Sequence, residues 1–283
     1  MEPIRDEYGH RPKKRLGQHF LRDRGVIREI IDRAGFLQSD HVLEIGAGLG
    51  ALTIPLAGRV RQVTAVEKDS QLTDTLGENL SRSGIANVTL INEDILKLDL
   101  EEIRGRSEKK IKAIGNLPYN ISSPFLEKLL ANRDIISRAV LMFQYEFARR
   151  LVSGPGGREY GGITVMIQYD AAVSPLLEVA KEAFYPMPKV GSMVLAIDME
   201  RPHPVRAKDE AEFRRVVKAA FSHRRKTVLN SLKGALPSYG GDAISEALKR
   251  CGIDSRRRAE TMDIDEFISL ASELNGMEGD KSH

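Results

Sequence analysis

The residues with the clearest chemical potential form one tetrapeptide, Asn116-Leu117-Pro118-Tyr119, directly after a short β-rich run. An amide oxygen, a backbone carbonyl and an aromatic ring suit a planar nucleobase that carries an exocyclic amine. The amine of adenine is a poor nucleophile because its lone pair is delocalised. Two acceptors, the Asn116 side chain and the Leu117 or Pro118 carbonyl, would favour a pyramidal nitrogen that can attack. Tyr119 adds a stacking surface worth ~1–3 kcal/mol per base. The competing interpretation is a proline turn with a buried tyrosine.

A glycine-rich turn joins another β-rich run to a helical stretch, in the sequence Leu43-Glu44-Ile45-Gly46-Ala47-Gly48-Leu49-Gly50-Ala51-Leu52-Thr53. Glycines in such a turn tolerate positive φ and remove Cβ atoms, so the backbone can approach a ligand closely. Glu67, about 20 residues further on, is placed to bind a ribose. NAD and S-adenosylmethionine both fit this pattern, and a tight packing turn is the third interpretation.

The next two β-rich runs are also followed by polar side chains, Asp94 and Asn116. Ligands of an open α/β sheet lie across the C-terminal ends of the strands. We therefore expect Gly46, Glu67, Asp94 and Asn116 to contact one elongated molecule in succession. Asp94 suits an adenine amino group, although its position suits a helix N-cap equally well.

The elements that must position these residues alternate between short β-rich runs and helical stretches, which indicates an α/β fold. We expect helices over stretches such as 70–82 and 124–131, and an antiparallel pair formed by the last two strands at one edge. The seven strand candidates are Val42–Ile45, Val63–Val66, Val88–Ile91, Ile111–Ile114, Ala139–Phe143, Thr164–Tyr169 and Met193–Ile197. Seven strands suffice for a doubly wound sheet.

A short, stiff linker, Arg201-Pro202-His203-Pro204, separates this region from a stretch with helical periodicity. We predict a sheet domain over 1–200, in which 1–40 form an N-terminal arm and helix. A small, basic, all-helical domain is predicted over 201–275, and a polar tail over 276–283.

Composition and charge exclude several classes of protein. No apolar run reaches the ~20 residues of a membrane helix, and the polar N-terminus lacks a signal-peptide core, so we expect a soluble cytoplasmic protein. One cysteine and six scattered histidines predict no metal site. Residues 201–260 carry fifteen Lys/Arg against seven Asp/Glu, a net +8. Such a zone favours a polyanionic partner, and a solvated helix face is the alternative for Arg224, Arg225 and Lys226.

Taken together, these motifs resemble those of the small-subunit ribosomal RNA adenine-N6,N6-dimethyltransferases over nearly the whole chain. The matching stretches are 15–21, 44–53, 116–119, 184–192, 221–227 and 258–260. The resemblance implies a Rossmann-like class I methyltransferase fold. His19 departs mildly from the family, in which asparagine is frequent at this place.

The resemblance also implies individual roles. Residues that would bind S-adenosylmethionine are Gln18, His19 and Leu21 at its methionine end, Gly46 and Gly48 in the loop, Glu67 with Lys68 at the ribose, Asp94 with Ile95 at the adenine, and Asn116. Catalysis would rest on Asn116 to Tyr119. Phe184 would cover the target base on the face opposite Tyr119, and Arg224, Arg225 and Lys226 would bind RNA. Judged alone, Phe184 suits a protein core, and Gln18 and His19 suit an anchored N-terminal arm.

The leading hypothesis is transfer of methyl groups from S-adenosylmethionine to the N6 amines of two adjacent adenines. These would lie in the 3′-terminal hairpin loop of small-subunit rRNA. Its partners would be the small ribosomal subunit and its rRNA, with no membrane and no metal, and the enzyme would be monomeric. The alternatives are a large-subunit rRNA adenine methyltransferase of the antibiotic-resistance type, an RNA-binding assembly factor in which methylation is secondary, and an NAD-dependent oxidoreductase.

Overall fold

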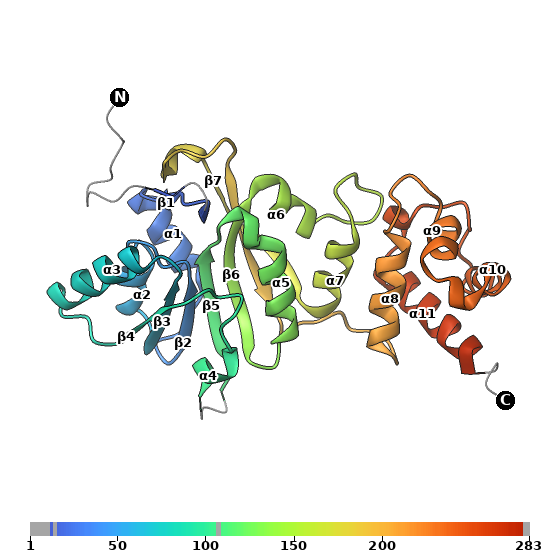
Figure 1. The fold of residues 1–283 in the computed structure, drawn as a ribbon, viewed down its shortest axis with the longest axis horizontal. Coiled ribbons are helices and arrows are strands. Elements are labelled where there is room, and N and C mark those ends of the chain that lie inside the picture. The colour runs from blue at the N-terminus through green and yellow to red at the C-terminus, as the bar shows by residue number, and fades with distance from the viewer. Residues whose placement is uncertain (1–11, 14–15, 106–108, 280–283) are drawn as a thin grey trace. The chain divides into compact units, whose positions relative to one another are not determined.

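A computed structural model describes residues 12–13, 16–105 and 109–279, with side chains described up to Met277 (Figure 1). The chain divides into two compact units. One contains the residues before 149 together with 173–200, and the other contains 149–172 together with the residues after 200. Residues 149–172, which the sequence prediction places in the first domain, thus group with the helical unit. Within the described ranges, no helix is long and apolar enough to cross a membrane.

The first unit is built on a seven-stranded sheet with the order β4-β3-β2-β5-β6-β9-β7. The strands are β2 (His41–Ile45), β3 (Gln62–Glu67), β4 (Val88–Asn92), β5 (Ile111–Asn116), β6 (Ile136–Gln144), β7 (Ala172–Val179) and β9 (Ser192–Asp198). Strands β2 to β6 pair parallel with one another, and β9 pairs antiparallel with β6. The predicted doubly wound, seven-stranded sheet is confirmed.

One predicted strand is wrong. Thr164–Tyr169 lies in the helix α7 (Gly162–Asp170), and the strand of this region is β7, which follows directly. The expected antiparallel pair of 164–169 with 193–197 is therefore not formed, and β7 lies beside β9 instead. A short apolar run that is buried on all sides has the same hydrophobic pattern in a strand as in a helix, so the pattern alone does not distinguish the two.

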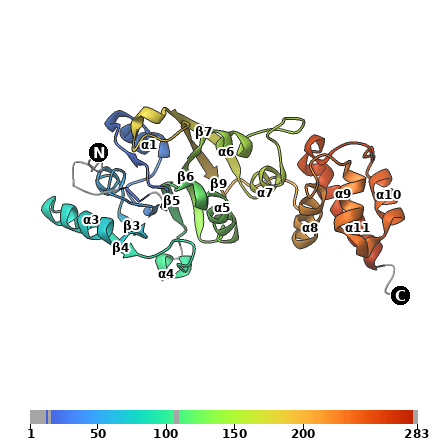
Figure 2. The ribbon, with the colours of Figure 1, turned by 45° about the horizontal axis from the view of Figure 1, so that its top comes forward.

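Helices cover both faces of the sheet, because neighbouring residues of a strand point to opposite sides. The helices of the first unit are α1 (Arg24–Ala34), α2 (Thr53–Ala57), α3 (Ser70–Arg82), α4 (Leu100–Arg104) and α5 (Ser122–Ala131), and the boundary after residue 148 falls within α6 (Tyr145–Leu151). Val63 and Ile114 share one buried cluster with residues of α1, α2 and α3, and α5 lies on the other side (Figure 2). The predicted helix over 70–82 coincides with α3.

The N-terminal segment is tied to the first unit by a two-stranded ribbon. β1 (Phe20–Leu21) pairs antiparallel with β8 (Phe184–Tyr185), and the N–H of Arg22 donates to the Ala183 carbonyl at 2.8 Å. This pairing fixes the residues just before α1 beside the rest of the fold.

The second unit is helical, as the periodicity predicts. Its helices are α7, α8 (Glu210–Ala220), α9 (Val228–Ala235), α10 (Gly241–Arg250) and α11 (Ile264–Gly279). Phe213, Val216, Val217 and Ala220 of α8 are buried in its core together with Val165 of α7. α11 continues to Gly279, beyond residue 275 where the sequence prediction ends the domain.

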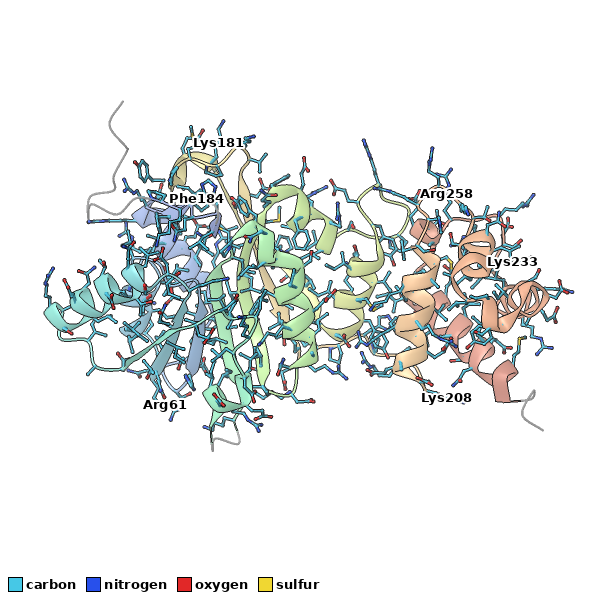
Figure 3. All side chains as sticks on the ribbon, in the orientation of Figure 1. Arg61, Lys181, Phe184, Lys208, Lys233 and Arg258 are labelled. Atoms are coloured by element: carbon cyan, nitrogen blue, oxygen red, sulfur yellow. The ribbon has the colours of Figure 1, made fainter. Side chains whose placement is uncertain are left out.

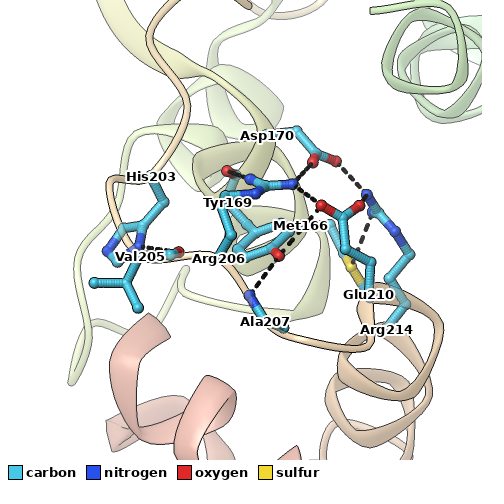
Figure 4. Close-up of polar contacts among 9 residues, drawn as sticks. All are labelled: Met166, Tyr169, Asp170, His203, Val205, Arg206, Ala207, Glu210 and Arg214. Carbon is cyan, nitrogen blue, oxygen red and sulfur yellow. Dashed lines mark hydrogen bonds and ion pairs between the residues drawn. The ribbon is translucent and has the colours of Figure 1, made fainter.

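A buried carboxylate joins the two chain segments that form this unit (Figure 4). Asp170 at the end of α7 is fully buried and accepts hydrogen bonds from Arg206 at 3.2 Å and Arg214 at 2.7 Å. The Arg206 guanidinium also lies 3.6 Å above the Tyr169 ring, which stacks on Phe213 with the centroids 4.2 Å apart. Asp170 is thus a fully paired buried charge.

Candidate active site

The glycine turn after β2 keeps the backbone close to the end of β5. Gly46 has a φ of +72°, a backbone conformation that other residues rarely adopt, and a Cβ there would make an ordinary contact of 3.6 Å with the Asn116 carbonyl. A Cβ on Gly115 would lie only 2.7 Å from the Ile45 carbonyl. Glycine at both positions therefore lets the turn and the predicted catalytic residues approach each other.

Glu67 is held at the end of β3 by backbone N–H groups. Its two carboxylate oxygens accept hydrogen bonds from the N–H of Gly48 at 3.0 Å and of Asp69 at 2.9 Å. Burial raises the pKa of Glu67 despite these two bonds. The carboxylate is thereby oriented before any ligand arrives.

Asp94 follows β4 and serves a local structural role as well as facing the site. Its Oδ1 accepts from the Leu96 N–H at 3.0 Å, and its Oδ2 accepts from Lys68 Nζ at 2.8 Å. The Lys68 hydrogen bond holds the pKa of Asp94 below its usual value. Asp94 therefore caps a turn and not a helix, because the next helix begins at Leu100 with Asp99 as its N-cap, and its role as an adenine ligand stays a prediction.

One cavity of about 740 Å³ runs past all these strand ends. Every predicted cofactor residue lines it, as do all four residues of the tetrapeptide: Gln18, His19, Leu21, Gly46, Gly48, Glu67, Lys68, Asp94, Ile95, Asn116, Leu117, Pro118 and Tyr119. This volume is within the range of small-molecule sites. Among the described residues, no group of three or more His, Cys, Asp or Glu is arranged to hold a metal ion.

The tetrapeptide presents acceptors to this cavity. The Asn116 amide nitrogen donates to the His19 carbonyl at 3.0 Å, and its amide oxygen accepts no hydrogen bond from any described residue. The Pro118 carbonyl accepts from the Ile121 N–H at 3.0 Å, whereas no such bond engages the Leu117 carbonyl in the described part of the chain. The Asn116 and Leu117 oxygens thus keep free acceptor capacity.

Tyr119 is half-buried, with its hydroxyl 3.3 Å from Ser192 Oγ. Burial raises the pKa of this hydroxyl. The His19 ring stacks on Tyr119 with a centroid distance of 5.7 Å and an interplanar angle of 27°. The His19 ring thus lies against Tyr119 in this structure, and stacking of a target base on Tyr119 stays a prediction.

Phe184 is placed differently from the other predicted catalytic residues. It lies in β8 opposite Leu21, is only 4% exposed, and does not line the cavity (Figure 3). It belongs to the same buried cluster as residues of α1. Its role as a cover for the target base stays a prediction.

Sequence reasoning missed two acids beside the cavity. Glu44, on β2, is 1% exposed and lines the cavity, and its Oε2 has no hydrogen-bond partner among the described residues. Burial raises the pKa of Glu44 to about 8, so the group carries a proton at neutral pH. Asp69 is buried at the start of α3. The signal for Asp69 was its position before a helical stretch, which suggests an N-cap.

In the helical unit, two of the three predicted RNA-binding residues line a second cavity. Arg224 and Lys226 border a space of about 310 Å³ together with Arg150 and the first residues of α7, whereas Arg225 does not border it. The Arg224 guanidinium contacts the Arg158 carbonyl and lies 3.9 Å from Glu260. At the start of α7 the Gly161 N–H donates to Thr164 Oγ1 at 3.1 Å, and the N-terminal end of the helix adds positive potential to this cavity.

Comparisons with known proteins agree with this geometry. The family model described as ribosomal RNA adenine dimethylase matches residues 9–276. The ribosomal RNA small subunit methyltransferases A of Desulforapulum autotrophicum and Geobacter sulfurreducens are each 45% identical over 268 residues, covering 94% of this chain and 93% and 96% of theirs. The chain belongs to the ribosomal RNA adenine dimethylase family.

Solved structures support the same assignment. A dimethyladenosine transferase from Plasmodium falciparum superimposes with a TM-score of 0.76 at 26% identity, covering 92% of this chain and 98% of that one. The 23S rRNA methyltransferase ErmE superimposes with a TM-score of 0.70 at 28% identity, covering 90% and 99%. The likeness thus extends over both units of the chain.

Proposed function

We propose that this chain transfers methyl groups from S-adenosylmethionine to the N6 amines of two adjacent adenines in the 3′-terminal hairpin loop of small-subunit rRNA. The products would be N6,N6-dimethyladenosines, made on the assembling small ribosomal subunit. The observation that carries the proposal is the position of Asn116–Tyr119, which share one cavity with the glycine turn and Glu67. Family membership and the small-subunit methyltransferases that resemble the chain support the reaction and its target.

The lining residues fit S-adenosylmethionine. Glu67, oriented by two N–H groups, can accept from a ribose diol, and Asp94 can accept from an adenine amine. Gln18, His19 and Leu21 would border the methionine end. When bound, this cofactor supplies an electrophilic methyl group on a sulfonium centre.

The residues of the chain act by positioning an amine beside that centre. The Asn116 oxygen and the Leu117 carbonyl accept the two hydrogens of the adenine amine, which directs the nitrogen lone pair away from the ring plane. The free acceptor capacity of Leu117, in contrast to the engaged Pro118 carbonyl, favours Leu117 as the second acceptor. After the first transfer only one amine hydrogen remains, so the two acceptors cannot both be required in the second step.

The target base needs an open face of the Tyr119 ring. The His19 ring stacks on one face of Tyr119, so the base would stack on the other face while His19 stays in place. Loop adenines are already partly unstacked, so turning one into the site costs less than extruding a base from a duplex. Stacking on Tyr119 offsets part of the remaining cost.

RNA recognition is assigned to the helical unit. Arg224, Arg225 and Lys226 would contact phosphates, and the first residues of α7 line the same cavity as Arg224 and Lys226. Phosphate contacts position an RNA and make its binding salt-dependent.

The decisive experiment is incubation of unmodified small subunits with labelled S-adenosylmethionine, followed by mapping of the methylated nucleotides. We expect label at N6 of two adjacent adenines near the 3′ end of the rRNA, with up to two methyl groups on each. Label on the large subunit instead would favour the antibiotic-resistance type of enzyme. Tight NADH binding without S-adenosylmethionine binding would contradict the proposal altogether.

A further inference from the structure

The segment that carries Gln18 and His19 is held by the buried acid Asp69. Asp69 belongs to none of the motifs described above and has no part in the proposed chemistry. Lys13 Nζ lies 2.7 Å from Asp69 Oδ1, and Gln18 Nε2 donates to Asp69 Oδ2 at 3.1 Å. The Lys13 N–H donates in turn to Gln18 Oε1 at 2.7 Å. The three residues thereby form a closed ring of hydrogen bonds around one carboxylate.

Asp69 also touches the predicted ribose ligand. Its own N–H donates to Glu67 Oε1 at 2.9 Å. Its side chain is 1% exposed, whereas that of Lys13 is 31% exposed. Burial by itself pushes the pKa of Asp69 upward, but the hydrogen bonds from Lys13 and Gln18 outweigh this and hold the pKa below its usual value. The carboxylate is therefore ionised when it holds the segment.

The same segment reaches the methyl-acceptor end of the cavity one residue later. His19 accepts from the Asn116 amide through its carbonyl and stacks its ring on Tyr119. Its Nδ1 lies 2.6 Å from the Pro186 carbonyl. A shift of Gln18 would thus be passed directly to the residues that contact Asn116 and Tyr119.

An N-cap role does not account for these contacts. Asp69 caps α3 by accepting from the Gln71 N–H, but Asp23 and Asp99 cap α1 and α4 in the same way. Those two acids are exposed, and the hydrogen bonds found for their carboxylates in the described residues come from backbone N–H groups. Asp69 differs because it is buried and binds two side chains of the N-terminal segment.

We propose that Asp69 is a positioning residue for methyl transfer: it orients Glu67 through its N–H and, through Lys13 and Gln18, keeps His19 against Asn116 and Tyr119. One residue would then set both ends of the cavity, the cofactor ribose and the methyl acceptor. The inference rests on the proposed function for its kinetic effect. The contacts that it predicts for residues 16–21 do not depend on that function.

The test compares Asp69→Asn, Lys13→Met, the double variant and the control Asp99→Asn. Asparagine is as good an N-cap as aspartate, so Asp69→Asn keeps the cap and removes the charge. Lys13→Met leaves Asp69 and its cap intact.

We expect each single variant to lower kcat/KM at least tenfold, with kcat reduced as well as cofactor affinity. The double variant should lose no more than about twofold beyond the worse single variant, because both changes break one interaction. Asp99→Asn should remain within twofold of wild type.

Two further measurements separate this proposal from a failure of the proposed function. Calorimetry with S-adenosylhomocysteine should show weaker binding in both single variants, and amide exchange of residues 16–21 should become faster in both but not in Asp99→Asn. These effects should appear even if the wild-type protein proves to methylate a different RNA. The proposal would be overturned if Lys13→Met showed wild-type amide exchange in residues 16–21 together with wild-type kcat/KM. It would also be overturned if the loss of kcat/KM in the double variant equalled the product of the two single losses.

Discussion

Two buried acids, one in each unit of the chain, differ in how completely they are paired. In the helical unit, Asp170 is fully buried and both of its oxygens are paired with arginines. In the sheet unit, Glu44 is equally buried but has an unpartnered oxygen, and the Asn116 oxygen accepts nothing from the described residues. Both incompletely paired groups line the same cavity.

The completeness of pairing indicates whether a buried polar group stabilises the fold or serves a ligand. A buried charge that is fully paired contributes to a defined packing of the segments that it joins. A buried polar group without a partner costs free energy, and such groups are retained where a ligand or a reaction uses them. Removal of the Asp170 carboxylate should therefore lower the free energy of unfolding, whereas removal of the Asn116 acceptor should lower activity.

The largest effect is expected from Asp170→Ala. Removing this carboxylate leaves Arg206 and Arg214 without their buried partner, and breaking such a pair costs ~3–5 kcal/mol. Urea unfolding should show this loss in the free energy of unfolding. The matched control is Glu246→Ala, which breaks an exposed pair with Arg250 and should cost less than about 1 kcal/mol. Equal losses in the free energy of unfolding would show that Asp170 contributes no more to stability than an exposed ion pair.

Asn116→Ala should leave the fold intact and abolish most of the transfer. It removes one of the two acceptors that prepare the amine, and loss of a single preorganised group of this kind costs roughly 10²–10³-fold in kcat. Affinity for S-adenosylhomocysteine should stay within a few fold of wild type. Single-turnover methylation and calorimetry measure the two quantities. Near-normal turnover would refute the role given to Asn116.

Glu44→Gln should change the pH dependence of stability. The folded protein keeps a proton on Glu44 up to a pKa of about 8, whereas the unfolded chain releases it near 4.5. The native state therefore binds more protons between these values, and wild-type stability falls as pH rises through this window. The variant lacks this contribution, so wild type should lose roughly 2 kcal/mol more than the variant between pH 6 and pH 8. The raised pKa would be contradicted if the denaturant midpoints of wild type and variant changed by the same amount between pH 6 and pH 8.

The smallest effect is expected in RNA affinity. Arg224→Glu combined with Arg225→Glu should weaken binding of the small-subunit RNA hairpin by roughly tenfold and flatten its salt dependence. Lys249→Glu with Arg250→Glu makes the same change in charge at another exposed site of the helical unit and should have little effect. Fluorescence anisotropy at several salt concentrations measures both. An unchanged slope would mean that Arg224 and Arg225 only form a solvated face.

Much of the site could be predicted because parallel strands end at one edge of a sheet. Gly46, Glu67, Asp94 and Asn116 each follow a strand that was recognisable from its apolar run, and all four line one cavity. The alternation of such runs with helical stretches was enough to predict the doubly wound sheet.

What the sequence could not predict depends on contacts between distant segments. The helix α7 was taken for a strand because its core partner Phe213 lies more than forty residues later in the chain. Asp69 was missed because nothing local indicates that Lys13 and Gln18 reach it. Phe184 is buried, as its residue type alone suggested, but no local pattern predicts that it pairs with Leu21.

The helical unit is assembled from two stretches of chain separated by β7 to β9. Its boundary is therefore not a single cut point. A fragment ending at residue 200 would retain α7 but lose α8, so that Val165 and Tyr169 would face water and Asp170 would lack both arginines. The region after 200 would in turn lack the tyrosine on which Phe213 stacks. A single cut at residue 200 would therefore not separate the two units. A stable fragment of the helical unit must include residues 149–172 as well as the region after 200.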